Sequence, residues 1–519
     1  MMRKFFNITG SCNPERHYMV DSPERFAAVE RLIDGGNYFT INRARQYGKT
    51  TTLQTIRRRL SDKYLIIKTS FERVGDSSFQ DEVAFARLFA RLMCREMPSD
   101  PENDGYRLYW EELEKKDSDM DALGTHISNF CQSSSKPIVL LIDEVDQSSN
   151  NQIFVRFIGM LRDLFLEREK RGMSSTFHSV VLAGVYDVKN LKLKLRPDEE
   201  RKYNSPWNIA ADFNVDMTFH SEEIAQMLGD YERDVHTGMD IQAISKEIYR
   251  YTSGYPFLVS KLCKVIDEEL NQEWTAEGVQ NAAKATIFNK NTLFTSLTKN
   301  LETYPELKRF VYSLSILGDT ITYDPNNPVM DFATMFSIIK YDANRKVSIH
   351  NIIFEEVLNN YFIAEQNIAD MGKLRPMYNY VKDNRLDMEF VLRRFRDLIH
   401  EEYREEDDKF KEQQGRLIFL SFLKPIINGT GFYYVEPQTR DNRRMDLVVT
   451  YGSEEFILEL KIWRGDKYER TGREQLSEYL TVRGKDKGYL LTFDFSKNKV
   501  DREPDWVEVN GKRIFEVIV

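Results

Sequence analysis

The chain has 519 residues, of which 41% are apolar and 12% are aromatic, and its formal net charge is -9 at pH 7. This length and composition indicate a globular protein with about three or four domains rather than one. The acidic balance argues against a protein that coats nucleic acid over its whole surface, although a local basic surface can coexist with it.

Cysteine usage and hydropathy exclude two further classes of protein. The four cysteines lie far apart without the spacing of metal ligands, which argues against a disulfide scaffold and fits a reducing compartment. The first residues lack the apolar run of a signal peptide, and no stretch approaches the roughly 20 apolar residues of a membrane span. We therefore expect a cytoplasmic protein that does not contact membranes.

The first chemically informative stretch is 38–53, which predicts a short strand, a tight loop and the start of a helix, after a helix over 23–33. Its Gly48-Lys49-Thr50 tripeptide supplies what phosphate binding requires at a helix N-terminus: inward amides, a lysine for the phosphates and a hydroxyl for Mg2+. The residues expected to bind nucleotide here are Arg45, Gln46, Tyr47, Gly48, Lys49, Thr50 and Thr51, and Thr50 is also an expected Mg2+ ligand.

One position departs from the strict phosphate-loop pattern. A full Walker A motif has a glycine five residues before Gly48, and this chain has Arg43 there. The pattern alone is therefore compatible with a basic turn before a surface helix, and it leaves the geometry of the loop open. A partner motif further along the chain favours the phosphate loop.

That partner is a buried strand over 137–143 that ends in carboxylates. Parallel sheets expose their functional groups at the carboxyl ends of the strands, which places Asp143 and Glu144 at the functional edge. We expect Asp143 to hold Mg2+ through water and Glu144 to polarise the water that attacks the γ-phosphate. A strand over 64–69 and an amphipathic helix over 79–97 separate the two motifs.

The chain continues with a predicted helix over 152–171 and a buried strand over 178–187. Asp187 and Asn190, at the polar end of that strand, either sense the γ-phosphate or are plain loop residues. Helical segments follow, and Ser221 is the expected cap of the first one.

Two further segments have two readings each. His17 and Tyr18 precede the phosphate loop, and they either stack on the nucleotide base or pack in the ordinary way. Gly254 and Pro256, at the start of a later helix, either let the backbone approach the nucleotide or form a structural turn.

Residues 10–265 resemble the AAA-like ATPases of bacteria, which are similar to the AAA+ and STAND groups of P-loop ATPases. The resemblance rests on three motifs of this sequence: HYMV at 17–20, RQYGKT at 45–50 and GYPFLV at 254–259. It implies an ATP-binding αβα core with a helical lid. Because such ATPases usually complete their site with an arginine from a neighbour, it also implies a homo-oligomer.

The middle of the chain, 307–362, resembles the winged-helix domain that often follows such lids. Winged helices bind DNA or brace neighbouring domains, and the lack of a concentrated basic recognition helix in this sequence favours bracing. A polar helical connector is expected over 367–385.

The C-terminal part combines carboxylates with a lysine on two predicted strands. Asp446 lies in one strand, and Glu459 and Lys461 share one face of the next because strand side chains alternate. Two carboxylates from adjacent strands can hold Mg2+, or Mn2+ in its place, while the lysine orients or deprotonates a water aimed at a phosphodiester. Asp446 and Glu459 are therefore expected metal ligands.

Residues 410–495 resemble the PD-(D/E)XK nuclease superfamily, although Met445 stands where the usual proline precedes the first acidic residue. The resemblance implies cleavage of nucleic acid, DNA in the first place, with Gln475 as a supporting catalytic residue. The ordered set is Glu436, Asp446, Glu459, Lys461, Gln475 and Tyr479. The basic residues expected to attract the phosphate backbone are Arg440, Arg443, Arg444, Arg464, Lys467, Arg470 and Arg473.

These patterns predict an α/β protein with a P-loop αβα ATPase core over 1–218 and a helical lid over 219–300. Three further parts are predicted: a winged-helix-like module over 301–366, a connector over 367–395 and a C-terminal α/β PD-(D/E)XK nuclease-like domain over 396–519. We expect the nucleotide state to gate cleavage or assembly. The alternative is an ATP-dependent scaffold or sensor whose nuclease-like domain grips nucleic acid without cutting it.

Overall fold

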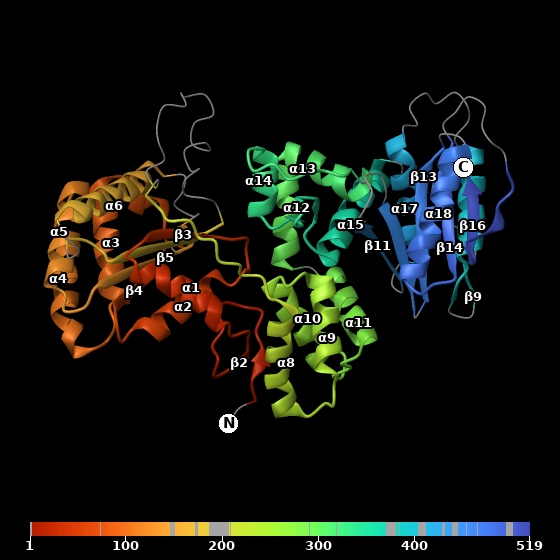
Figure 1. Cartoon of the computed structure of the whole chain (residues 1–519). Coiled ribbons are helices and arrows are strands. Elements are labelled where there is room, and N and C mark those ends of the chain that lie inside the picture. Colours follow the sequence, from red (N-terminus) through yellow and green to blue (C-terminus); the bar gives the residue numbers. More distant parts are fainter. Residues whose placement is uncertain are drawn as a thin grey trace. The chain divides into compact units, whose positions relative to one another are not determined.

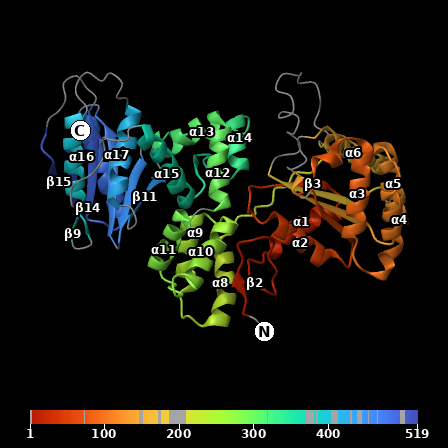
Figure 2. The same cartoon turned by 180° about the vertical axis from the view of Figure 1, so that it is seen from behind.

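A computed structural model describes residues 3–72, 74–145, 151–171, 175–185, 207, 209–289, 291–317, 319–369, 380–382, 385–402, 412–427, 431–437, 445–452, 454–463, 466–494 and 502–519. The chain divides into two compact units, Met1–Ala282 with Met335–Ser337 and Ala283–Thr334 with Ile338–Val519. Figure 1 and Figure 2 show the elements of both units from opposite sides.

The first unit is built on a parallel sheet in the order β3-β6-β5-β4. Its strands are β3 (Tyr38–Asn42), β6 (Ser179–Gly184), β5 (Ile138–Asp143) and β4 (Leu65–Ser70). On the outer side of β3, Ala211 forms an isolated parallel bridge with Phe39. Because all the strands are parallel, their carboxyl ends meet at one edge, as the two sequence motifs require.

Helices cover both faces of this sheet, which explains why its strands read as nearly continuous apolar runs. The helices α3 (Glu82–Glu96), α4 (Asp104–Glu114), α5 (Met120–Ser133) and α6 (Gln152–Arg171) build a large apolar core on one face. On the opposite face lie α1 (Pro23–Asp34) and α2 (Lys49–Leu60) (Figure 1).

The stretch expected to be the lid contains α8 (Ser221–Val235), α9 (Ile241–Thr252), α10 (Pro256–Glu268) and α11 (Ala276–Phe288), and this group of helices is called the lid below. The expected cap of its first helix is wrong by one residue. His220 is the N-cap, and its backbone amide donates to the carboxylate of Glu223 at 2.9 Å, whereas Ser221 is the first helical residue. The short strands β1 (Phe5–Phe6) and β2 (His17–Tyr18) pair in parallel and contact α10 and α8.

The second unit begins with α12 (Thr292–Thr303), α13 (Pro305–Tyr312), a π-helical turn Ser313–Leu317 and α14 (Pro328–Met335). An antiparallel hairpin of β7 (Ile339–Tyr341) and β8 (Val347–Ile349) and then α15 (Ile352–Ala369) follow. Helices followed by a hairpin agree with the order expected for a winged helix, and that assignment stays a prediction.

The expected helical connector is wrong at its C-terminal end, since among its described residues only 367–369, the last residues of α15, are helical. The short strands β9 (Val381–Lys382) and β10 (Arg385–Leu386) form an antiparallel hairpin there, and residues 370–379 lie outside the described part of the chain. The helix α16 (Met388–Glu402) begins directly after this hairpin.

A six-stranded sheet in the order β11-β12-β13-β14-β16-β15 forms the C-terminal part. Its strands are β11 (Gly431–Pro437), β12 (Met445–Tyr451), β13 (Glu454–Ile462), β14 (Lys487–Phe493), β15 (Asp505–Val509) and β16 (Lys512–Ile518). The helix α18 (Asp466–Val482) packs against four of these strands through Leu476 and Leu480. The helices α16 and α17 (Glu412–Ile427) contact Phe493 and Phe515, whose positions along their strands belong to the opposite face.

Two general expectations concern chemistry rather than architecture. All four cysteines are free thiols, as their spacing predicts. Among the helices of the described residues, none has both the length and the apolar composition that crossing a membrane requires.

Candidate functional site

The predicted phosphate loop is a tight turn between β3 and α2. Two of its residues have a positive φ, Gln46 at 58° and Gly48 at 82°, and Gly48 is the N-cap of α2. Glycine suits that position because it adopts a left-handed conformation without steric cost. The turn ends at the N-terminus of α2, where free amides and the helix dipole favour an anion.

Lys49 lies inside this turn. Its side chain is nearly buried, and its ammonium donates to the carbonyl oxygens of Arg43 and Ala44, both at 2.9 Å. The loop is therefore wrapped around the group that was expected to reach the phosphates. Thr50 is half-buried in the first turn of α2. The hydroxyl of Thr51 accepts a hydrogen bond from the backbone amide of Cys12 at 3.1 Å, so in this structure it holds the N-terminal segment against α2.

Arg43 occupies the position of the missing glycine without obstructing the loop. Its guanidinium donates to the carbonyl oxygens of Asn42 and Val215, both at 2.8 Å, and lies 5.5 Å from the centre of the Phe213 ring. Burial lowers the pKa of Arg43. This side chain therefore connects the loop to the segment after the sheet.

The strand register brings the carboxylates of β5 to the same edge as the loop. Ile142 pairs with Leu182 of β6, and Leu182 pairs with Thr40 of β3, so Asp143 is level with the end of β3. Asp187 and Asn190, the candidates to sense the γ-phosphate, lie outside the described residues.

Asp143 is buried, with 3% of its surface exposed, and two groups of the described residues lie near its carboxylate. The backbone amide of Glu144 donates to its Oδ1 at 3.1 Å, and the ammonium of Lys68 lies 3.8 Å from its Oδ2. Glu144 itself has a φ of 53°, which is an uncommon conformation for glutamate. The chain therefore turns sharply where the strand ends. Lys68 was not among the expected site residues, although a lysine directly after the apolar run 65–67 was a visible signal.

The lid meets the loop through the turn before α10. A Cβ on Gly254, which has a φ of 71°, would lie 1.9 Å from the carbonyl oxygen of Phe219. This position therefore requires glycine for the turn itself. The next residue, Tyr255, donates from its hydroxyl to the carbonyl oxygen of Arg45 at 2.5 Å, and Pro256 begins α10.

A cavity of about 450 Å³ lies beside the loop, between the N-terminal segment, α1, α2 and the lid. Its size is typical of small-molecule sites. Of the expected nucleotide-binding residues, Gln46, Tyr47, Gly48, Thr51 and Pro256 line it. Arg45, Lys49, Thr50 and Gly254 do not line it. His17 and Tyr18 do not line it either, and both are buried.

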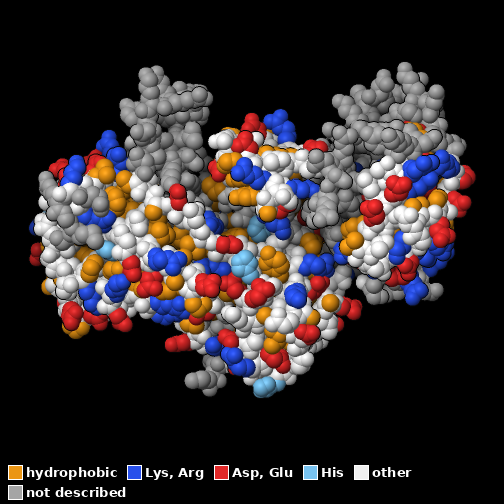
Figure 3. Space-filling view, in the orientation of Figure 1, with side chains coloured by type: hydrophobic (Ala, Val, Ile, Leu, Met, Phe, Trp, Pro, Cys, Tyr) orange, Lys and Arg blue, Asp and Glu red, His pale blue; other side chains and the backbone are white. Residues whose placement is uncertain are grey.

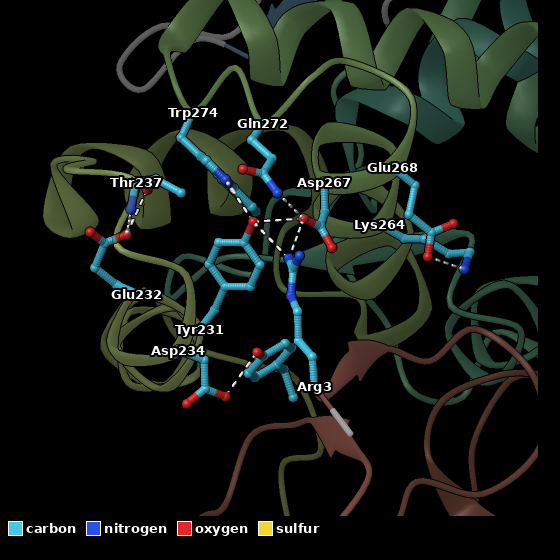
Figure 4. A network of polar contacts seen from close by, with 11 residues as sticks. Arg3, Tyr231, Glu232, Asp234, Thr237, Lys264, Asp267, Glu268, Gln272 and Trp274 are labelled. Atoms are coloured by element: carbon cyan, nitrogen blue, oxygen red, sulfur yellow. Dashed lines mark hydrogen bonds and ion pairs between the residues drawn. The ribbon is translucent and has the colours of Figure 1, made fainter. Parts of the chain in front are cut away.

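The N-terminal segment is anchored to the lid by a polar network (Figure 4). Arg3 pairs with Asp267 of α10 at 2.6 Å, and the hydroxyl of Tyr231 of α8 donates to the same carboxylate at 2.7 Å. Tyr18 donates to Asp234 at 2.9 Å, and burial, with this hydrogen bond, raises the pKa of Tyr18 to about 12. One wall of the cavity therefore belongs jointly to the N-terminal segment and the lid.

The donor chemistry around the loop fits a nucleoside triphosphate with Mg2+. The Thr50 hydroxyl and the Asp143 carboxylate are hard oxygen ligands of the kind that Mg2+ prefers. Within the described parts of the chain, no group of three or more His, Cys, Asp or Glu side chains is close enough to hold a metal ion. Mg2+ in phosphate sites is held by one or two carboxylates plus the phosphates, so the expected arrangement requires no such group.

The C-terminal sheet places the expected nuclease residues in register. Asp446 of β12 pairs directly with Glu459 of β13, and Glu436 of β11 pairs with Asp446 on its other side. Glu459 is 1% exposed. The ammonium of Lys461 lies 3.7 Å from Oε1 of Glu459 and 3.4 Å from Oε1 of Gln475, which α18 contributes. Three of the predicted residues therefore meet between β13 and α18.

Gly472 makes room for this lysine. A Cβ at that position of α18 would lie 2.7 Å from the Lys461 ammonium and 3.0 Å from its Cδ. A glycine inside a helix is destabilising relative to alanine, so this one has a packing reason. A glycine within the predicted helix was the visible sequence signal of this packing.

Two of the other expected residues have their own partners. Arg473 pairs with Glu469 at 2.8 Å and with Glu516, so its charge is neutralised within the protein. The Tyr479 hydroxyl accepts from Arg483 at 3.0 Å. Arg470 is exposed, Lys467 lies in α18, and Arg440, Arg443, Arg444 and Arg464 lie outside the described residues. On the face drawn in Figure 3, basic and acidic side chains are interspersed over the described residues.

Comparisons with known proteins give one family match and several distant structural likenesses. A family model described as AAA-like domain matches residues 10–326. No curated protein sequence matches the chain significantly. Among solved structures, a Walker-type ATPase of Pyrococcus abyssi is 10% identical with a TM-score of 0.48, over 68% of this chain and 99% of that one. The ORC2 protein of Aeropyrum pernix is 12% identical with a TM-score of 0.39, over 69% and 96% of the two chains. RuvB of Thermotoga maritima is 12% identical with a TM-score of 0.32, over 64% and 92%.

Proposed function

This chain belongs to the AAA-like domain family of P-loop ATPases, and from that premise we propose that it is a nuclease controlled by ATP. The proposed activity of the second unit is metal-dependent cleavage of phosphodiester bonds in nucleic acid, DNA in the first place. The observation that carries the proposal is the meeting of Glu459, Lys461 and Gln475 between β13 and α18, with Asp446 paired opposite Glu459.

In the ATPase part, each proposed role has a structural basis. The Lys49 ammonium at the centre of the loop exchanges its two carbonyl partners for the β- and γ-phosphates. Asp143 and Thr50 hold Mg2+ at the edge of the sheet. Glu144, which follows directly after the strand, orients and deprotonates the water that attacks the γ-phosphate. The base and sugar occupy the adjoining cavity, between the N-terminal segment and α10.

In the nuclease part, a divalent cation held by Asp446 and Glu459 supplies Lewis-acid polarisation of the phosphodiester when it is bound. Lys461 orients the attacking water and stabilises the negative charge that develops on the phosphate. Gln475 accepts a hydrogen bond from Lys461 and so fixes the direction of its ammonium. A domain that only bound nucleic acid would have no need of a buried carboxylate and a lysine held side by side in this way.

The test is a cleavage assay with the purified full-length protein. Labelled single- and double-stranded DNA and RNA are incubated with and without ATP, and with Mg2+, Mn2+ or EDTA. We expect metal-dependent cleavage of at least one substrate in the wild type. Lys461→Met should abolish it while nucleic-acid affinity falls only a few-fold, because a single phosphate contact carries a small share of the binding.

A matched control comes from the same domain. Lys485 pairs with Glu455 at 3.2 Å, away from the proposed site, so Lys485→Met removes a lysine–glutamate contact without touching it. It should cleave like the wild type. Lys49→Ala should abolish ATP binding. The difference in cleavage rate between this variant and the wild type in the presence of ATP then measures how strongly nucleotide binding controls the nuclease. Metal-independent binding without cleavage of any substrate would instead favour an ATP-dependent scaffold or sensor.

A further inference from the structure

The phosphate loop is bonded to the segment that leads into the lid, here called the hinge segment and defined as residues 213–219. This segment lies between the outer bridge of the sheet at Ala211 and the start of α8. Two loop side chains reach it directly. Both are large, at positions where a phosphate loop needs no side chain at all.

The first is Arg43. Its guanidinium donates to the Val215 carbonyl at 2.8 Å and packs over the Phe213 ring, while its own carbonyl accepts from the Lys49 ammonium at 2.9 Å. One residue therefore contacts both the group expected to bind phosphate and the hinge segment. An event that changes the hydrogen bonds of Lys49 therefore acts directly on Arg43.

The second is Tyr47, which precedes the loop glycine. Its hydroxyl lies 3.0 Å from the Thr218 hydroxyl, and its ring packs edge-on against Tyr255 with centroids 4.7 Å apart. Tyr255 in turn donates to the carbonyl of Arg45. The loop, the hinge segment and the first turn of α10 are thus joined in a closed ring of contacts.

The hinge segment also forms hydrogen bonds with α1 and with the lid. Arg25 donates to the carbonyls of Asp216 and Thr218, at 2.6 and 3.0 Å, and pairs with Glu223 of α8 at 2.9 Å. The amide of Phe219 donates to the carbonyl of Gly254 at 2.9 Å, in the turn before α10. A shift of the hinge segment therefore shifts both ends of the lid that face the cavity.

We propose that Arg43 and Tyr47 are positioning residues of the nucleotide site, which transmit occupancy of the phosphate loop through the hinge segment to the lid. Arg43 replaces the glycine of the strict motif for this reason. The proposal rests on the nucleotide-binding part of the function above and is independent of the nuclease part. Two sites linked in this way typically change one another's affinity by about 5- to 150-fold.

The decisive variant is Arg43→Gly, which restores the strict Walker A pattern and removes only the link. Nucleotide affinity is measured with a non-hydrolysable ATP analogue, and hydrogen exchange of α10 and the hinge segment is followed with and without the analogue. We expect affinity within about threefold of the wild type, since the strict pattern is sufficient for phosphate binding. Nucleotide-induced protection of α10 should be lost, and kcat should fall at least tenfold with little change in KM.

Further variants keep the test falsifiable if Arg43→Gly folds poorly. Tyr47→Phe deletes one hydroxyl and keeps the ring, and with Thr218→Val it forms a double-mutant cycle for the second link. Arg43→Lys retains one donor and should restore part of the protection. Arg16→Gly, an exposed arginine in a surface turn of the same unit, is the matched control and should behave as the wild type.

Two results would overturn the proposal. One is wild-type protection and kcat in both Arg43→Gly and Tyr47→Phe. The other is loss of nucleotide binding in Arg43→Gly as complete as in Lys49→Ala, because Arg43 would then serve binding itself. A wild type that binds no ATP analogue is a different failure, since it would refute the proposed nucleotide function before any variant is compared.

Discussion

The ammonium of Lys68 lies 3.8 Å from Oδ2 of Asp143, across two neighbouring strands of the parallel sheet. Ser70 pairs with Asp143 in the register of β4 and β5, so Lys68, two residues earlier, belongs to the same face of the sheet. The side chains of Lys68 and Asp143 are 14% and 4% exposed. A carboxylate this deeply buried requires a positive neighbour, and Lys68 supplies it.

This pairing predicts that Lys68→Met destabilises the protein in a metal-dependent way. Without divalent cations the Asp143 charge would lose its neighbour, and unfolding free energy should fall by about 1–3 kcal/mol. With ATP and Mg2+ the metal ion supplies the missing charge, so most of the loss should be recovered. Thermal unfolding in EDTA and in Mg2+–ATP measures both values. An equal loss in the two conditions would show that Lys68 has no connection with a metal site.

Glu144→Gln is expected to separate nucleotide binding from hydrolysis. The amide keeps the shape of the side chain and the backbone bond to Asp143 but cannot accept a proton, so turnover should fall by roughly 100-fold or more. ATP affinity should stay close to the wild-type value. Single-turnover hydrolysis and equilibrium binding of labelled ATP test this. Unchanged turnover would mean that another residue is the base, or that the domain only binds nucleotide.

Gly472→Ala is expected to impair the proposed nuclease without impairing folding. The added methyl group would displace the flexible end of Lys461, which costs little, while alanine raises helix stability by up to about 1 kcal/mol. Cleavage should fall at least tenfold at an unchanged or higher melting temperature, and its pH profile should shift because the ammonium has moved. Gly229→Ala, in α8, has open space at its Cβ and is the matched control. Wild-type cleavage by Gly472→Ala would argue against a precise role for Lys461.

A buried ion pair connects α15 to α17, next to the first strand of the C-terminal sheet, and we expect it to contribute to stability. Glu356 of α15 pairs with Lys424 of α17 at 2.5 Å, and the Lys424 ammonium lies 5.3 Å from the centre of the Tyr433 ring in β11. Glu356→Ala leaves Lys424 as an unpaired charge and should cost about 3–5 kcal/mol. The double substitution Glu356→Leu with Lys424→Met should be far milder. Chemical denaturation of the wild type, Glu356→Leu, Lys424→Met and the double variant gives the coupling.

The same glutamate has a predictable effect on pH dependence. Burial, partly offset by Lys424, raises the pKa of Glu356. The unfolded chain therefore loses this proton at lower pH than the folded protein, and the contribution of Glu356 to stability is largest at acid pH. It decreases as the pH rises from the unfolded pKa to the raised folded pKa. Glu356→Gln should remove that decrease, which urea titrations across the acid range would detect.

The sequence by itself determined the parts of this protein whose chemistry is local. The apolar run before Asp143, the helix over 152–171 and the Gly48-Lys49-Thr50 turn are each specified by neighbouring residues, so their periodicity and composition predicted them. The order Asp446, Glu459, Lys461 and Gln475 likewise lies on consecutive elements, and alternation along one strand placed two of them on one face.

Only the tertiary structure decided which distant residues meet. In the sequence, Arg43 is only a departure from the Walker A motif. Its hydrogen bond to Val215 joins residues 172 positions apart, and no sequence periodicity predicts such a contact. Three other relationships also depend on tertiary packing. They are the ion pair of Arg3 with Asp267, the approach of Lys68 to Asp143, and the space beside Gly472 that Lys461 occupies. Each arises where separate elements pack together, and packing depends on the shape and position of both partners, whereas a sequence pattern describes only one of them.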